Sequence, residues 1–150
     1  MEASLALRAA EAESLDPVLA ALPPASSRAR WGGRVLSALP TLFLAMDGVM
    51  KLFAPPPVVE ASARIGVTQP TLGWIGAIEL VCLALYLVPR TAVLGAVLLT
   101  GYLGGAVALH VRMGDPLATH VLSPVYVGAL FWAGLYLRDV RVRALVRALT

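Results

Sequence analysis

Charged residues are scarce in this sequence. Asp, Glu, Lys and Arg together make up 14% of the chain, whereas hydrophobic residues make up 59%. A soluble domain ordinarily carries about a quarter charged residues, and the mean hydropathy of +0.79 is correspondingly high. The composition therefore argues against an ordinary soluble domain. A soluble bundle of buried helices is disfavoured as well, because the long apolar segments leave no polar face for water.

Cysteine is nearly absent, since Cys82 is the single one. This excludes an intramolecular disulfide and any Cys-x-x-Cys redox or metal motif. A lone cysteine in an apolar segment more often fills space than acts as a nucleophile, and we expect packing here. The N-terminal segment also lacks the pattern of a signal peptide, because Glu2, Glu11, Glu13 and Asp16 stand where basic and apolar residues would be required, so we expect no cleavage.

Four apolar stretches are present instead, each close to the roughly 20 residues that an α-helix needs to cross a bilayer. They predict membrane-spanning helices at about 35–53, 72–88, 92–111 and 121–137. Proline and glycine in the intervening segments support these limits. The predicted fold is an all-α, integral membrane four-helix bundle (34–145) behind an N-terminal extramembrane extension (1–33). The segment 57–65 further predicts a short helix in the membrane interface.

Basic residues are sorted between the two ends of the predicted bundle. With four spans, the N-terminal arm, the middle loop and the C-terminal tail share one side, which holds nine arginines, whereas the opposite side holds only Arg64 and Arg112. Lys and Arg are retained on the cytoplasmic side, so we expect both termini in the cytoplasm. The basic tail, 138–147, would contact anionic headgroups. Membrane topology thus accounts for the net charge of +3 without a nucleic-acid partner.

Ionisable residues inside the predicted spans are the first candidates for a functional site, because each costs about 2.5–3.5 kcal/mol near the bilayer centre. Asp47 and Lys51 are four residues apart on one helix face and can form an ion pair, although Lys51 could also extend toward the interface. Gly48 between them would allow a neighbouring helix to approach closely. Glu79 must face inward, as a neutral hydrogen-bond donor or as a proton carrier.

The third span adds Tyr102 and His110, which lie on one face, and small residues that include Gly101, Gly104 and Gly105. His120 follows after a short loop, so both imidazoles are expected at the same end of the bundle. Two histidines raise metal or haem ligation as an alternative, but no complete ligand set is evident and we predict no metal site.

Several segments of this sequence resemble the DoxX-like family of small bacterial four-helix membrane proteins. The resemblance covers about 35–145. It is carried by DGVMKL (47–52), RIGV (64–67), LGWIGAIEL (72–80), YLVPRT (86–91) and HVRMGDP (110–116). In order, a Lys ends the first helix, a Glu lies inside the second and a His ends the third.

The resemblance implies a bacterial cytoplasmic (inner) membrane protein without an assigned biochemical role. Characterised relatives are associated with thiosulfate:quinone oxidoreduction or membrane redox complexes, which implies a quinone ligand, redox partner proteins and roles for Lys51, Glu79 and His110. The missing second cysteine speaks against thiol–disulfide chemistry. We therefore expect an accessory subunit of a quinone-linked redox system more than an autonomous enzyme. The alternative is a non-enzymatic structural protein or small carrier, and the glycines of the third span would suit a homo-oligomer.

Overall fold

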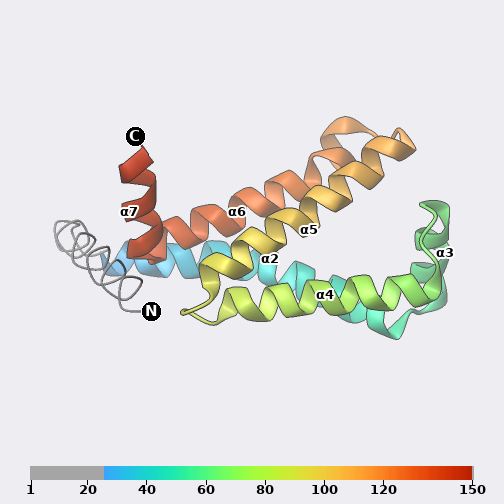
Figure 1. Ribbon diagram of the computed structural model, residues 1–150, viewed down its shortest axis with the longest axis horizontal. Coiled ribbons are helices and arrows are strands. Elements are labelled where there is room, and N and C mark those ends of the chain that lie inside the picture. The colour runs from blue at the N-terminus through green and yellow to red at the C-terminus, as the bar shows by residue number, and fades with distance from the viewer. Residues whose placement is uncertain (1–25, 150) are drawn as a thin grey trace, which may run out of the picture.

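Four long helices form the body of the protein (Figure 1). The structure, a computed structural model, describes residues 26–149. The long helices are α2 (Ser27–Phe53), α4 (Gln69–Leu87), α5 (Ala92–Met113) and α6 (Ser123–Arg138). Each is long and apolar enough to cross a membrane, the last together with a π-helical turn, η1 (Leu117–Val121), that precedes it. The predicted all-α, four-span architecture is confirmed.

Two short helices lie across the ends of the bundle. α3 (Pro56–Arg64) follows α2, and α7 (Val140–Leu149) follows α6. Both run steeply to the long helices in Figure 1, as helices that lie along a membrane surface would. The short helix predicted at 57–65 is therefore present as α3, and most of the basic tail lies in α7.

The first long helix begins earlier than the predicted span. α2 starts at Ser27 rather than Val35, because the Ser26 hydroxyl accepts a hydrogen bond from the Ala29 backbone N–H (3.1 Å) and caps the helix. Part of the predicted extension, 27–33, is thus helical and continuous with the first span. The rest of that extension, through residue 25, lies outside the described residues.

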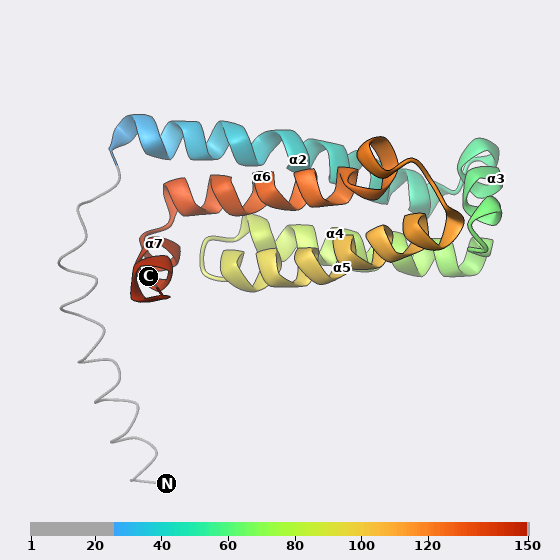
Figure 2. The same ribbon diagram turned by 90° about the horizontal axis from the view of Figure 1, so that it is seen from above.

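The long helices pack in a closed ring. α2 packs mainly against α4 and α6, and α5 packs mainly against the same two helices. Figure 2 shows α2 and α6 running alongside each other, with α4 and α5 forming the other pair. The core lies between the pairs and is filled by apolar side chains with one tyrosine: Leu44, Leu83, Tyr86, Ala96, Leu99, Phe131 and Leu135. Cys82 belongs to this core, as predicted for a packing residue.

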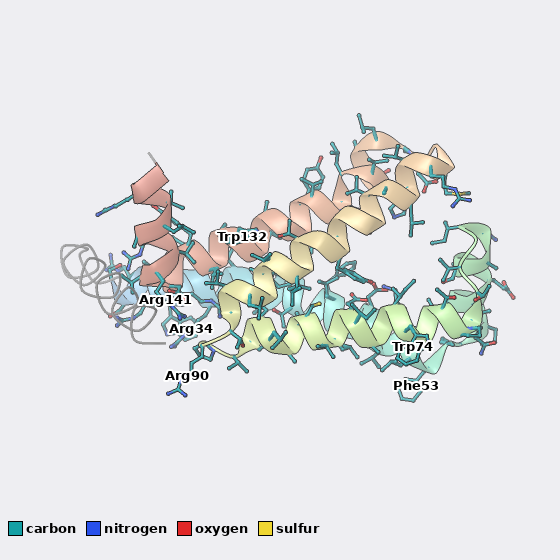
Figure 3. The ribbon with its side chains drawn as sticks, viewed as in Figure 1. Arg34, Phe53, Trp74, Arg90, Trp132 and Arg141 are labelled. Carbon is teal, nitrogen blue, oxygen red and sulfur yellow. The ribbon has the colours of Figure 1, made fainter. Side chains whose placement is uncertain are left out.

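The outside of the bundle is apolar. Phe53 is 81% exposed and Trp74 is 73% exposed, and both point away from the helices (Figure 3). Many aliphatic side chains of the four long helices are exposed in the same way. Soluble monomers rarely expose so much contiguous apolar surface, whereas hydrocarbon covers it without cost. The lipid bilayer is therefore the environment of the four helices.

Candidate functional site

The candidate site forms where α2 and α4 approach each other most closely. A Cβ atom added to Gly76 of α4 would lie 2.8 Å from the Gly48 carbonyl oxygen and 2.8 Å from the Lys51 Cβ. Only glycine fits in so narrow a space, which agrees with the close approach predicted at Gly48. Glu79 lies one helical turn beyond Gly76, so this contact brings its carboxylate to the Lys51 side chain.

Lys51 joins side chains from three helices. Its ammonium group donates to a carboxylate oxygen of Asp47 on α2, to Oε2 of Glu79 on α4 (2.9 Å) and to the hydroxyl of Tyr102 on α5 (2.8 Å). An ammonium has three protons, so all of its donors are engaged. We call Asp47, Lys51, Glu79 and Tyr102 the polar cluster. The predicted Asp47–Lys51 ion pair is present, and Lys51 does not extend outward.

Tyr102 links the two charged neighbours by accepting from one and donating to the other. Its hydroxyl accepts from Lys51 and donates to Oε2 of Glu79 (2.7 Å). The Lys51 ammonium is 5.5 Å from the Tyr102 ring centroid but 2.8 Å from its oxygen, so the contact is a hydrogen bond rather than a cation–π interaction. Oε2 of Glu79 therefore accepts two hydrogen bonds.

The polar cluster holds two carboxyl groups beside one ammonium group. The Glu79 side chain is fully buried and the Lys51 side chain is 17% exposed, whereas that of Asp47 is 41% exposed. Oε1 of Glu79 has no hydrogen-bond partner among the described residues. The cluster is neutral when one of the two carboxyl groups carries a proton.

A cavity of about 670 Å³ opens beside the polar cluster, within the usual size range of small-molecule sites. Asp47, Lys51 and Tyr102 contribute its charged and phenolic groups. Most of the remaining wall is apolar and comes from all four long helices, for example Phe43, Leu72, Ile75, Leu103, Leu109 and Val127. The cavity can therefore hold an apolar molecule whose polar group faces Lys51.

His110 also lines the cavity, but it belongs to a different group of residues. Its Nδ1 lies 2.6 Å from a carboxylate oxygen of Asp115, and its ring is 5.8 Å from that of His120. Eight residues of α5 separate it from Tyr102, about 12 Å along the helix axis. The two histidines do meet at one end of the bundle, as predicted, but no hydrogen bond or ion pair within 26–149 joins His110 to Glu79.

The surroundings of the two histidines bear on the alternative of metal or haem ligation. Within 26–149, no three His, Cys, Asp or Glu side chains gather in a way that could hold a metal ion. The His120 ring forms a hydrogen bond with the neighbouring Thr119 hydroxyl (2.9 Å) and does not line the cavity. The two histidines thus lie together at one end of the bundle, and of the two only His110 lines the cavity.

Sequence reasoning missed one part of the cavity wall. Ser62, Ile65 and Val67, in α3 and the turn after it, line the cavity with residues of the long helices. The apolar residues of this segment were a usable signal, but they were interpreted as membrane contacts. A Cβ at Gly101, Gly104 or Gly105 of α5 would meet nothing within 4 Å, and Gly101 and Gly105 line the cavity.

Comparison with known proteins adds one result. The model of the DoxX-like family matches residues 35–134, which include the polar cluster and both histidines. No curated protein and no solved structure matches the chain. The match covers most of the chain and the four long helices account for the apolar composition. This chain is an integral membrane protein and belongs to the DoxX-like family.

Proposed function

We propose that the protein is an accessory subunit of a membrane redox system and binds a quinol-like molecule in the cavity beside the polar cluster. The observation that carries the proposal is a large, mostly apolar cavity whose wall includes Lys51 and Tyr102, both hydrogen-bonded to the fully buried carboxyl group of Glu79. Buried ionisable groups in a membrane span are costly and by default indicate a functional site. In this role the chain binds and orients the ligand, while electrons pass through a partner protein.

The direction of the hydrogen bonds favours the reduced form of the ligand. Lys51 has no proton left to donate, and the Tyr102 hydroxyl already donates to Glu79. Acceptor capacity remains on the carboxylate of Asp47, which lines the cavity. A quinol hydroxyl can donate there, whereas a quinone carbonyl would have to displace an existing bond.

The first experiment is native mass spectrometry of the protein extracted gently from its own membrane. We expect a co-purifying quinone or quinol with the unchanged chain and its loss with Glu79→Gln, which removes the acid but keeps the side-chain size. Titration with a short-chain ubiquinol should then show binding weakened by roughly tenfold or more, because Glu79 holds Lys51 and Tyr102 in place on the cavity wall. Glu60→Gln on the exposed face of α3 is the matched control and should leave binding unchanged.

A structural role for the polar cluster is the second candidate, and the saturation of all three Lys51 protons favours it. Here the cluster would join α2, α4 and α5 without a ligand. Glu79→Gln would then lower thermal stability, with no quinol bound by either protein. Unchanged stability together with lost quinol binding would contradict this candidate and support the first.

The distribution of arginines supports a location for the bundle. Arg34, Arg90, Arg138 and most other arginines lie at the end where α2 begins, and Arg64 and Arg112 lie at the other. The positive-inside rule then favours the bacterial cytoplasmic membrane with both termini in the cytoplasm.

A further inference from the structure

A second pocket lies at the arginine-rich end of the bundle, away from the polar cluster. It measures about 210 Å³ and is bounded by three arginines, Arg30 and Arg34 on α2 and Arg138 at the end of α6. Its inner wall is formed by Tyr86 and apolar residues: Leu87, Pro89, Ala92 and Leu135. The pocket thus combines a basic rim with an apolar floor, at the end of the membrane-spanning helices.

Arg138 is fixed over this floor. Its guanidinium carbon lies 4.8 Å from the centroid of the Tyr86 ring, and Nη2 is buried without a hydrogen-bond partner among the described residues. Tyr86 cannot move easily, because its hydroxyl donates to the Phe131 carbonyl (3.0 Å) and contacts the Ser37 hydroxyl (2.8 Å). A buried guanidinium N–H without an acceptor is costly, so the site lacks a partner for Arg138.

The acidic residue at the pocket does not supply that partner. Asp139 lines the pocket, but its carboxylate accepts from the Arg141 guanidinium (3.0 and 3.2 Å) and from the Arg141 backbone N–H (2.9 Å). Arg141 is itself held by the Pro89 carbonyl oxygen (2.7 Å). The positive charges of the rim therefore outnumber the negative one, and Arg30 and Arg34 form no ion pair with a residue in 26–149.

From this geometry we infer that the pocket is a binding site for a phosphate group, held by Arg30, Arg34 and Arg138. Guanidinium groups recognise phosphate oxygens through paired N–H donors, and Nη2 of Arg138 offers one such donor. The volume corresponds to about seven water molecules at roughly 30 Å³ each, which leaves room for a phosphate with bound water. The phosphate can belong to an anionic phospholipid, whose chains would meet the apolar floor, or to a free phosphate compound.

A defined site and general attraction to anionic lipid lead to different results. General attraction depends on the number of basic residues near the surface, at about 1 kcal/mol for each. A defined site depends on which arginine is removed. Arg90 provides the comparison, because it lies on the exposed turn between α4 and α5, does not line the pocket and points away from the helices (Figure 3). Arg90→Gln and Arg138→Gln remove the same charge from the same end.

The test uses the full chain in a neutral detergent. Native mass spectrometry with added phosphatidylglycerol measures bound lipid, and a thermal-shift titration with inorganic phosphate measures the free ion. We expect Arg138→Gln and Arg34→Gln to weaken binding by roughly tenfold or more, and Arg90→Gln to leave it nearly unchanged. Arg138 also stacks on Tyr86, so Arg138→Gln could weaken binding by disturbing the fold. Arg34 is exposed on the rim of the pocket, and Arg34→Gln therefore tests binding without this effect on folding.

The two arms identify the source of the phosphate. Arginine-dependent retention of the lipid without a response to inorganic phosphate would support a headgroup, and a thermal shift by phosphate would support a free phosphate compound. Equal weakening by all three variants would overturn the inference in favour of general attraction. Absence of binding in both arms would overturn it as well.

Discussion

Lys51 holds the polar cluster together, since Asp47, Glu79 and Tyr102 all accept from its ammonium group. Glu79 lies at the middle of α4, where an ionised side chain costs about 2.5–3.5 kcal/mol, whereas Lys51 lies near the end of α2. Hydrogen bonds to charged groups return about 1.5–3 kcal/mol each, and Oε2 of Glu79 accepts one from Lys51 and one from Tyr102. These bonds therefore offset the cost of burying Glu79.

Asp139 gives a pH-dependent prediction at the residue scale. Burial alone would raise the pKa of the Asp139 carboxyl, but hydrogen bonds from Arg141 and the charges of Arg141 and Arg138 hold the pKa below its ordinary value. A group with a lowered pKa in the folded state stabilises the fold above its unfolded pKa, which is about 3.9. That contribution is lost as the pH falls through the lower, folded-state pKa.

We therefore expect Asp139→Asn to lower the stability of the protein at pH 7 by about 0.5–1 kcal/mol, because the Arg141 side chain of this ion pair is half exposed to solvent. The difference from the unchanged chain should shrink when the pH falls below about 4. Thermal unfolding in nanodiscs at several pH values measures it. A difference for Asp139→Asn that grows on acidification would contradict the prediction.

Local spacing predicts only part of the polar cluster. The pair of Asp47 and Lys51 follows from a separation of four residues on one helix. The bonds from Lys51 to Glu79 and Tyr102 depend on how three helices pack, which spacing along one helix does not determine. The sequence does predict that Glu79 faces inward and needs a partner, because an ionisable side chain inside a membrane span is energetically costly.

The helix α4 contains a matched pair of glycines that tests packing at the element scale. Gly76 faces α2 with no room for a side chain, whereas a Cβ at Gly73 would meet nothing within 4 Å. Gly76→Val should therefore separate α2 from α4 and move Lys51 away from Glu79. We expect a loss of about 1–3 kcal/mol of stability together with weaker quinol binding.

Gly73→Val is the control for this change, because it alters the same helix by the same atoms without a clash. Thermal unfolding should distinguish the two variants, with little change for Gly73→Val. Similar stability for both would mean that the close approach of α2 and α4 is not required.

Hydropathy predicts which part of a helix crosses the hydrocarbon, but the helix itself can begin outside that part. The end of α2 at Phe53 agrees with the predicted span, because Ala54 and three prolines follow it. Its start at Ser27 precedes the prediction because Arg28, Arg30 and Arg34 are polar without being helix breakers. The helix continues past the apolar stretch until the cap at Ser26.

The cavity depends on the arrangement of the whole molecule. α5 and α6 diverge from α2 and α4 toward the end that carries α3, as Figure 1 shows. The angle at which α5 and α6 diverge from α2 and α4 is set by close contacts at the other end of the bundle. There a Cβ at Gly95 of α5 would lie 2.2 Å from the Tyr86 backbone nitrogen of α4. Composition and periodicity predict four helices but contain no measure of this angle. The cavity was therefore beyond sequence reasoning, although the apolar residues of the α3 segment were a signal for part of its wall.

The orientation of the bundle is the last prediction, and it follows from the unequal distribution of arginine between the two ends. If the arginine-rich end faces the cytoplasm, Ser27 lies inside and Leu117, at the opposite end, lies outside. A Cys82→Ala background removes the only native cysteine, which is buried. Ser27→Cys and Leu117→Cys then place one thiol at each end at exposed positions.

A membrane-impermeant maleimide distinguishes the two orientations. In intact spheroplasts, Leu117→Cys should be labelled and Ser27→Cys should be labelled only after permeabilisation. The reverse pattern would place Lys51, the cavity and α3 toward the cytoplasm, and the phosphate pocket would then face the outer leaflet. The part of the cavity wall that comes from α3 lies at the end of the bundle opposite the arginines. The expected labelling pattern therefore places this part of the cavity near the outer face of the membrane and the phosphate pocket near the cytoplasmic face.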